Sequence, residues 1–430
     1  MRRQIALRAF LFSVLLIALL SMLVGDAPPP GDFDTHLAGL VAGERFDFVA
    51  WTVQALGLKV SEAVAAEPNY LPASEQKQIV LDTFNLLDRA LELEQQIDHL
   101  FADPSQPDPH AATRQLSDQL VQVRAQLADL QPLAEEVLQE QIGIVLSAEG
   151  FAPLGQVVPP VSFHITELPG LLIVSPRDRI ERKAAISLRP GLSDAAEAER
   201  IEARVAEALD VSTLVVPLGG LATFPTMIYE TRNLNFVAEV GAHEWTHNYL
   251  TLRPLGATYA SSPELFTMNE TTANLVGKEI GDRVIERFYP ERYVPPAPKP
   301  TPGPSAEPTP ARDPAAFDFR AEMRATRVRV DELLAAGEVE AAEAYMEEQR
   351  KVFVAHGYVD LRKLNQAYFA FHGSYADQPG AAGADPVGPA VVELRERSAS
   401  LREFLETIAW LTSFEDLQEV LAAQTAHTDS

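Results

Sequence analysis

The stretch His243-Glu244-Trp245-Thr246-His247 is the most informative part of this chain. If these residues form a helix, His243 and His247 lie one turn apart on the same face, where two neutral imidazoles can bind one Zn²⁺. Glu244 then stands beside the first histidine, within reach of a water on the metal. Zinc lowers the pKa of such a water toward neutrality, and a carboxylate can accept its proton. The five residues therefore predict a zinc centre with its own general base.

The neighbouring sequence indicates a helix. Apolar residues around the motif recur at helical spacing: Phe236, Val237, Val240, Tyr249 and Leu250. Histidine is scarce, with nine in 430 residues, and only His243 and His247 are four apart. The motif is therefore expected inside a partly buried helix and not on a solvated face.

A second helix is expected downstream. Ser262 suits the N-cap and Pro263 the first helical position. This helix carries Asn269-Glu270-Thr271-Thr272-Ala273-Asn274, in which Glu270 and Asn274 share a face. One of the two can bind metal while the other accepts a hydrogen bond from a ligand histidine. A catalytic zinc needs three protein ligands and an open position, so this helix is the expected source of the third ligand.

The strings HEWTH and NETTAN together resemble the gluzincin metallopeptidases, the thermolysin-like clan with two histidines and a glutamate on zinc. The resemblance implies one Zn²⁺ held by His243, His247 and Glu270. It places Asn274 where the clan has an acidic residue that orients the first histidine. It also implies an α+β fold, in which a small mixed β-sheet precedes the zinc-binding helices and extra helical segments lie before and after this core.

Short apolar, β-branched segments between about residues 150 and 232 predict strands. They lie at 157–158, 161–165, 171–174, 185–188 and 213–217. A charged helix is expected from about 193 to 208. An edge strand near 215–224 would pair with the backbone of a substrate. Tyr229 and Glu230, just before the zinc helix, are candidates to line the cleft, although both are ordinary loop residues in type.

A late segment, 364–375, adds candidate catalytic residues. Four of its side chains step by three, four and three residues and would share one face: Asn365, Tyr368, His372 and Tyr375. Gluzincins place a tyrosine or histidine from a later helix where it stabilises the developing oxyanion. The segment is also similar to one in a group of bacterial predicted aminopeptidases. The resemblance makes Tyr375 the first candidate for this role and His372 the second. It slightly favours aminopeptidase over endopeptidase action, with Glu230 as a candidate anchor for the free amine.

The N-terminus indicates export. Met1-Arg2-Arg3 and Arg8 precede an uncharged apolar run at 9–25. This arrangement is typical of a cleaved signal peptide or an uncleaved membrane anchor, and the length of the run slightly favours the anchor. The absence of cysteine fits an exported protein that does not depend on disulfides. We expect the bulk of the chain outside the cytoplasm, secreted or held at the membrane.

The net charge of −26 argues against nucleic acid or anionic lipid as a partner. A peptide substrate is the expected partner, and the sequence does not indicate an oligomeric state. Apolar residues at helical spacing on both sides of the Pro-rich stretch 103–109 predict an antiparallel helical hairpin.

The expected organisation has six parts. They are a signal peptide or anchor at 1–25, a tether at 26–73, the helical hairpin at 74–149, the metallopeptidase core at 150–292, a Pro-rich linker at 293–315, and a C-terminal helical part at 316–425 that completes the active site.

The expected function is zinc-dependent hydrolysis of peptide bonds, with Glu244 as general base. The alternative is a non-catalytic, membrane-anchored scaffold or peptide-binding protein that keeps the zinc fold without turnover. Asn274 in place of the usual acid gives this alternative some weight, whereas the intact Glu244 counts against it.

Overall fold

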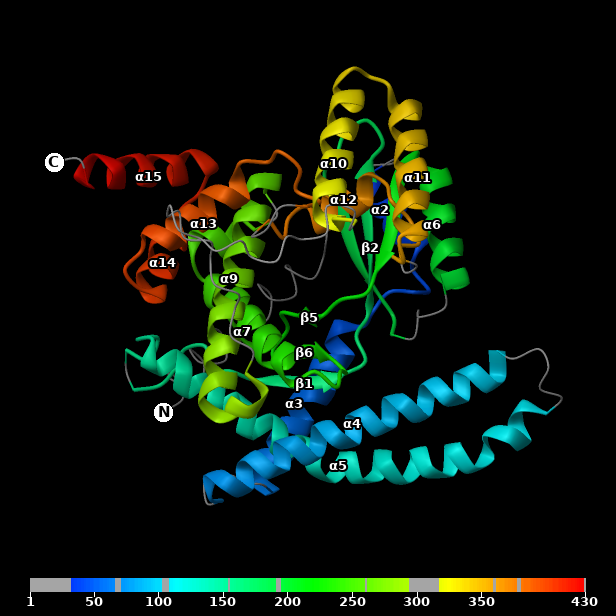
Figure 1. Cartoon of the computed structure of the whole chain (residues 1–430), viewed down its shortest axis with the longest axis vertical. Coiled ribbons are helices and arrows are strands. Elements are labelled where there is room, and N and C mark those ends of the chain that lie inside the picture. Colours follow the sequence, from blue (N-terminus) through cyan, green and yellow to red (C-terminus); the bar gives the residue numbers. More distant parts are fainter. Residues whose placement is uncertain are drawn as a thin grey trace, which may run out of the picture.

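The computed structural model describes residues 32–65, 71–102, 108–153, 155–190, 195–259, 261–293, 317–358, 361–376 and 380–428. It is a largely helical, mixed α/β structure with small sheets (Figure 1), which agrees with the expected α+β class. The N-terminal segment 1–25 and nearly all of the Pro-rich stretch 293–315 lie outside these ranges. Within them, no helix is both long and apolar enough to cross a membrane.

The strands form two three-stranded sheets, whereas the sequence predicted one. The first sheet is antiparallel, in the order β3 (Ala184–Leu188), β2 (Gly170–Pro176) and β4 (Val211–Val216). The second sheet is mixed, in the order β1 (Phe163–Thr166), β6 (Thr226–Tyr229) and β5 (Gly220–Leu221). In it β6 runs parallel to β1 and antiparallel to β5. Residues 157–158, expected as a strand, are irregular, and β6 was not expected.

The segment expected as a tether is built into the first sheet. It contains α2 (Phe33–Leu40) and α3 (Phe48–Ala65), and α2 packs against α6 (Ala195–Leu209). Between the two helices the backbone joins the edge strand β3, because the N–H of Phe46 donates to the carbonyl of Ser187 at 3.0 Å. This part of the chain therefore extends the sheet.

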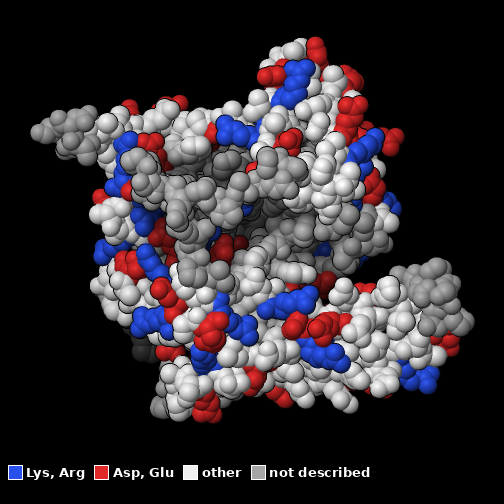
Figure 2. All heavy atoms as spheres, viewed as in Figure 1, with Lys and Arg blue, Asp and Glu red and all other residues white. Residues whose placement is uncertain are grey.

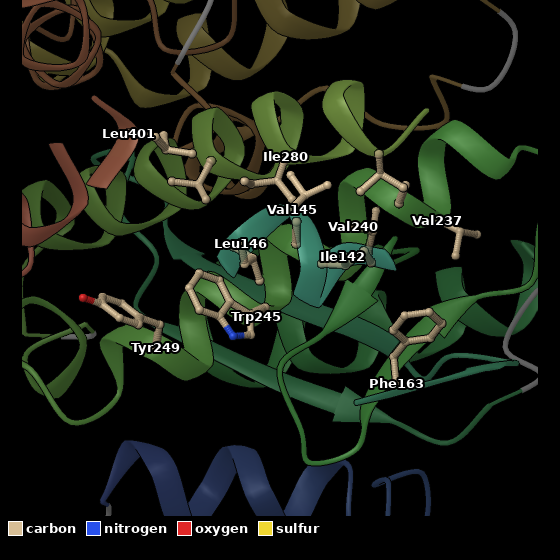
Figure 3. Packing of buried hydrophobic residues seen from close by; sticks show 14 of the residues in the cluster. Ile142, Val145, Leu146, Phe163, Val237, Val240, Trp245, Tyr249, Ile280 and Leu401 are labelled. Carbon is tan, nitrogen blue, oxygen red and sulfur yellow. The ribbon is translucent and has the colours of Figure 1, made fainter. Parts of the chain in front are cut away.

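The region expected as a helical hairpin is occupied by α4 (Ala73–Ala102) and α5 (Pro109–Ala148), which lie side by side (Figure 1). One face of the last turns of α5 is buried. There Ile142, Val145 and Leu146 pack near Trp245 (Figure 3). The hairpin is therefore joined to the main core.

That core also includes the C-terminal helices. One buried apolar cluster draws on six helices besides the hairpin and on the second sheet. The helices are α7 (Leu234–Leu250), α8 (Pro254–Ala257), α9 (Pro263–Phe288), α13 (Val387–Arg397), α14 (Leu401–Ile408) and α15 (Phe414–Thr428). A short 3₁₀ turn, Pro290–Arg292, follows α9. Elements far apart in the chain thus share one interior.

The helices after the Pro-rich stretch also reach the first sheet. α10 (Phe319–Ala335) and α11 (Val339–Ala355) form a pair with its own apolar cluster. The turn between them contains Gly337 with φ of 77°, a conformation that favours glycine. The short helix α12 (Gln366–His372) packs on β2 and β4. Tyr375, one of the late candidate residues, lies just after its C-terminal end.

Candidate metal centre

Helices α7 and α9 carry the two motifs, and both begin at capped residues. The side chain of Asn233 accepts a hydrogen bond from the N–H of Phe236 at 3.2 Å. The Ser262 hydroxyl accepts one from the N–H of Leu265 at 3.2 Å, and Pro263 takes the first position of α9. The cap predicted at Ser262 is confirmed. Each cap satisfies a backbone donor that the helix itself cannot pair.

Glycines on α9 let the two helices approach closely. A Cβ atom at Gly277 would lie 2.8 Å from Cβ of His243, and one at Gly281 would lie 2.8 Å from Cα of Glu239. Real Cβ atoms do not come this near, so a larger residue would push the helices apart. This close packing brings Glu270 to the two histidines.

The metal-binding atoms of the three expected ligands lie close to one another. His243 Nε2 and His247 Nε2 are 3.1 Å apart, and Glu270 Oε2 lies 3.8 Å and 3.7 Å from them. Two atoms that each lie about 2.1 Å from a tetrahedral zinc ion are about 3.4 Å apart. The triangle formed by the three ligand atoms therefore has about the size of one face of a tetrahedral zinc site. Within the described ranges, these three residues form a group that could hold a metal ion.

Glu270 supplies a further argument for a cation. Its Oε1 accepts a hydrogen bond from the Tyr259 hydroxyl, while its Oε2 is buried and finds no hydrogen-bond partner among the described residues. A buried carboxylate oxygen without a partner is costly. A metal ion between the three ligands would satisfy it.

The hydrogen bond that orients a ligand histidine comes from Asn269. Its Oδ1 lies 2.8 Å from Nδ1 of His247, and its Nδ2 donates to the carbonyl of Leu255 at 3.3 Å. With the proton on Nδ1, the Nε2 lone pair of His247 faces the metal position. Asn274, the residue expected to orient a histidine, lies one turn after Glu270 and lines a neighbouring cavity.

Burial and charge set the protonation of the ligands. Burial and the nearby charge of His247 lower the pKa of His243 to about 3, so its imidazole is neutral. Burial opposes the charged form of His247, but Glu270 and Glu244 outweigh it and raise the pKa to about 9. Burial likewise opposes ionisation of Glu270, yet the two histidines and Tyr259 lower its pKa to about 2. The site thus carries one proton that a metal would displace.

Glu244 lies beside the ligands with a different pKa. Its side chain is almost fully buried, and burial together with the charge of Glu270 raises its pKa to about 7. The strand β5 covers it, because a Cβ atom at Gly220 would lie 2.5 Å from Oε1 of Glu244. A carboxyl with a pKa near neutrality can both accept and return a proton at physiological pH.

The structure separates the two candidates for the oxyanion donor. Tyr375 lines the metal cavity, and its ring stacks on that of His243 with centroids 6.4 Å apart. Burial and the charges of Glu270 and Glu244 raise the pKa of Tyr375 well above its ordinary value, so its hydroxyl keeps the proton. His372 lines the neighbouring cavity, and burial lowers its pKa to about 4.

The four residues of the late segment that were expected to share a face do not lie on one helix. Asn365 caps α12 by accepting from the N–H of Tyr368 at 2.9 Å, and Tyr375 lies beyond the end of that helix. The turn that carries Tyr375 is tied to α9, because the Thr271 hydroxyl donates to the carbonyl of Ser374 at 3.3 Å. Tyr375 is therefore placed by a contact beside Glu270.

Two residues of the cavity were not predicted. Tyr259 reaches Glu270 from the connection between α8 and α9, and Arg182 lines the same cavity from the loop between β2 and β3. Neither belongs to a motif or a periodic pattern, so the sequence carries no local signal for either role. Only the path of the folded chain brings them to the metal ligands.

The candidates just before the zinc helix lie elsewhere. Glu230 forms an ion pair with Arg124 of the hairpin, and both it and Tyr229 line a large cavity on the other side of Leu218. Leu218 lines this cavity and the metal cavity. The expected anchor for a free amine thus already has a cationic partner.

Comparisons with protein-family profiles, curated proteins and solved structures returned no match to this chain. The function is therefore inferred from the residues of the site.

Proposed function

We propose that the protein is a zinc-dependent peptidase that acts outside the cytoplasm, exported through its N-terminal segment 1–25. The observation that carries the proposal is the convergence of His243, His247 and Glu270 on one point, with a buried carboxylate oxygen of Glu270 that has no hydrogen bond among the described residues. One Zn²⁺ fits these donors, since two imidazoles and a carboxylate leave a fourth position open for chemistry. When bound, zinc would act as a Lewis acid and make water a better nucleophile.

Glu244 is the residue that moves the proton. It takes a proton from the attacking water and then passes it to the leaving amine. Its position under β5 excludes bulk water from one side, and its pKa of about 7 suits both transfers. Tyr375 supports the reaction by donating a hydrogen bond from its hydroxyl to the carbonyl oxygen as negative charge develops there. Tyr259 holds Glu270 in place through its hydroxyl.

The cavity also suits an extended substrate backbone. The short strand β5 lies at the edge of the second sheet and lines the cavity with Gly220 and Leu221. An exposed strand edge can pair with a peptide backbone, which would lay the scissile bond near Glu244. Peptides are favoured over folded proteins because a strand edge accepts only an extended chain.

The choice between exo- and endopeptidase action depends on an anchor. Aminopeptidase action, favoured by the resemblance of the late segment, needs an acidic group for the free amine of the substrate. Glu230 is paired with Arg124 and lies in the adjacent cavity, so it gives this choice no support.

The test of this proposal is metal content measured together with hydrolysis. Purified residues 26–430 should bind about one zinc ion per chain, and a chelator should lower the melting temperature and stop cleavage of a quenched fluorescent peptide mixture. Zinc that stabilises the fold without any hydrolysis would favour the non-catalytic scaffold or peptide-binding protein. Failure to bind zinc would refute both.

A further inference from the structure

Arg182 is a cation in the metal cavity without an acidic partner in the described ranges. It lies in the loop between β2 and β3, all of which is described, with two other arginines. Arg177 pairs with Glu343, and Arg179 pairs with Glu181. Arg182 forms neither an ion pair nor a hydrogen bond with any described residue. Its guanidinium donors are therefore available to a bound molecule.

The guanidinium is held in position by aromatic rings. Its central carbon lies 3.2 Å from the centre of the Phe266 ring and 5.3 Å from the centre of the Tyr259 ring. Stacking on a ring fixes the plane of the group and leaves the N–H donors at its edge exposed to a planar acceptor. A carboxylate is the acceptor that matches this fork with two parallel hydrogen bonds.

The surroundings favour an anionic group near Arg182. The acidic residues that share its cavity, Glu244 and Glu270, belong to the metal centre. Arg182 also lines an adjoining cavity with Arg327, which pairs with Asp331. Two acidic residues line that cavity as well, and both have other partners: Glu181 pairs with Arg179, and Asp385 accepts the N–H of Val387. Over the visible face of the molecule, basic and acidic side chains are interspersed (Figure 2). An unpaired, stacked arginine beside the ligands thus stands out in a chain of net charge −26.

We propose that Arg182 binds a carboxylate of the substrate and makes the site selective for acidic peptides; this inference rests on the proposed peptidase function. The carboxylate is either the C-terminus of a short peptide or the side chain of Asp or Glu near the cleaved bond. Because Arg182 lies where the metal cavity meets the adjoining one, a peptide that spans both passes its guanidinium.

The test measures binding, so that it does not depend on turnover. Zinc-loaded Glu244→Gln protein is titrated with short alanine-rich peptides that carry a free or amidated C-terminus, and with Glu or Gln at each position in turn. One carboxylate should tighten binding about 10- to 100-fold, as expected for a charge-assisted bidentate pair. A difference between the free and amidated C-terminus would show that Arg182 binds the terminal carboxylate. A difference between Glu and Gln peptides would show that it binds a side-chain carboxylate.

Arginine variants give the matched controls. Arg182→Met in the same background should retain zinc and the affinity for neutral peptides but lose the preference for acidic ones. Arg182→Lys should keep part of the preference, because it retains the charge without the fork. Arg189→Met removes an equal charge just after β3, where Arg189 pairs with Glu197 and lines neither of the two cavities, and it should change nothing. Equal binding within every acid–amide and Glu–Gln pair, absence of peptide binding, or a preference that survives in Arg182→Met would overturn the inference.

Discussion

Glu244 and Glu270 are two buried carboxyl groups whose surroundings move their pKa values in opposite directions. Burial dominates at Glu244 and raises its pKa to about 7. At Glu270 the neighbouring histidines and Tyr259 outweigh burial and lower the pKa to about 2. Such a separation is how paired carboxyl groups take different roles. It supports the proposed roles of proton transfer for Glu244 and metal binding for Glu270.

Single substitutions distinguish the proposed roles of Tyr375 and His372. Tyr375→Phe removes the donor beside His243 and should lower kcat about 100- to 1000-fold with little change in zinc content. His372→Gln, in the adjoining cavity, should have a much smaller effect on kcat. Steady-state kinetics with zinc analysis of both variants checks this. A larger loss for His372→Gln would reverse the assignment.

Metal binding should release a proton. Without metal, His247 carries its proton below a pKa of about 9, whereas His243 is neutral above about 3 and Glu270 is ionised above about 2. A ligand histidine must be neutral, so lowering the pH from 9 toward 7 should weaken zinc binding about tenfold per unit. Calorimetric titration at pH 7 in buffers of different ionisation enthalpy should report about one proton released. Release of none would show that His247 is neutral without metal.

The close packing of α7 against α9 determines the distances between His243, His247 and Glu270. Gly277→Ala places a methyl group against His243 and Glu239, so it should separate the helices and weaken zinc binding at least tenfold. Gly143→Ala is the matched control, since a Cβ atom there meets nothing within 4 Å in helix α5. That change should leave zinc binding intact and stabilise the fold by about 0.5–1 kcal/mol. Equal zinc affinity in the two variants, measured by competition with a chromophoric chelator, would contradict this role of the contact.

Sequence reasoning succeeded where the signal is local. The spacing of His243 and His247 needs only one helix, and the cap at Ser262 needs only its next residues. It missed the strand β6 because this strand is four residues long and depends on pairing with β1. It did not find Asn269, which contacts His247, because the rotation of α9 against α7 is a tertiary property.

The distant parts of the chain are joined by buried charges as well as by apolar packing. Glu202 of α6 is fully buried and pairs with Arg362 and Lys363, which lie just before α12. Its carboxylate also accepts the N–H of Val215 at 2.6 Å. Removing one member of such a network leaves buried charge without a partner, which costs about 3–5 kcal/mol. The C-terminal part is thus fastened to the first sheet, near Tyr375.

The whole molecule should behave as one unit across the Pro-rich stretch. A specific protease site inserted within residues 294–316 and then cut should leave two fragments that co-elute and retain activity, because the main core draws on helices from both sides. Expressed alone, residues 26–292 should not fold stably, since the surface that α13 and α14 cover would be exposed. Gel filtration and activity of the cut protein check this. Separation of the fragments with full activity in the first would contradict it.

If His243, His247 and Glu270 hold zinc for catalysis, the protein should hydrolyse peptide bonds with Glu244 as the base. The most direct measurement is mass-spectrometric mapping of products from a mixed peptide library, with zinc-loaded wild type run beside Glu244→Gln of equal zinc content. Cleavage by wild type alone is expected. Successive losses of single N-terminal residues would indicate an aminopeptidase, and internal cuts would indicate an endopeptidase. Identical product patterns from the two proteins, or no products from either, would contradict the claim.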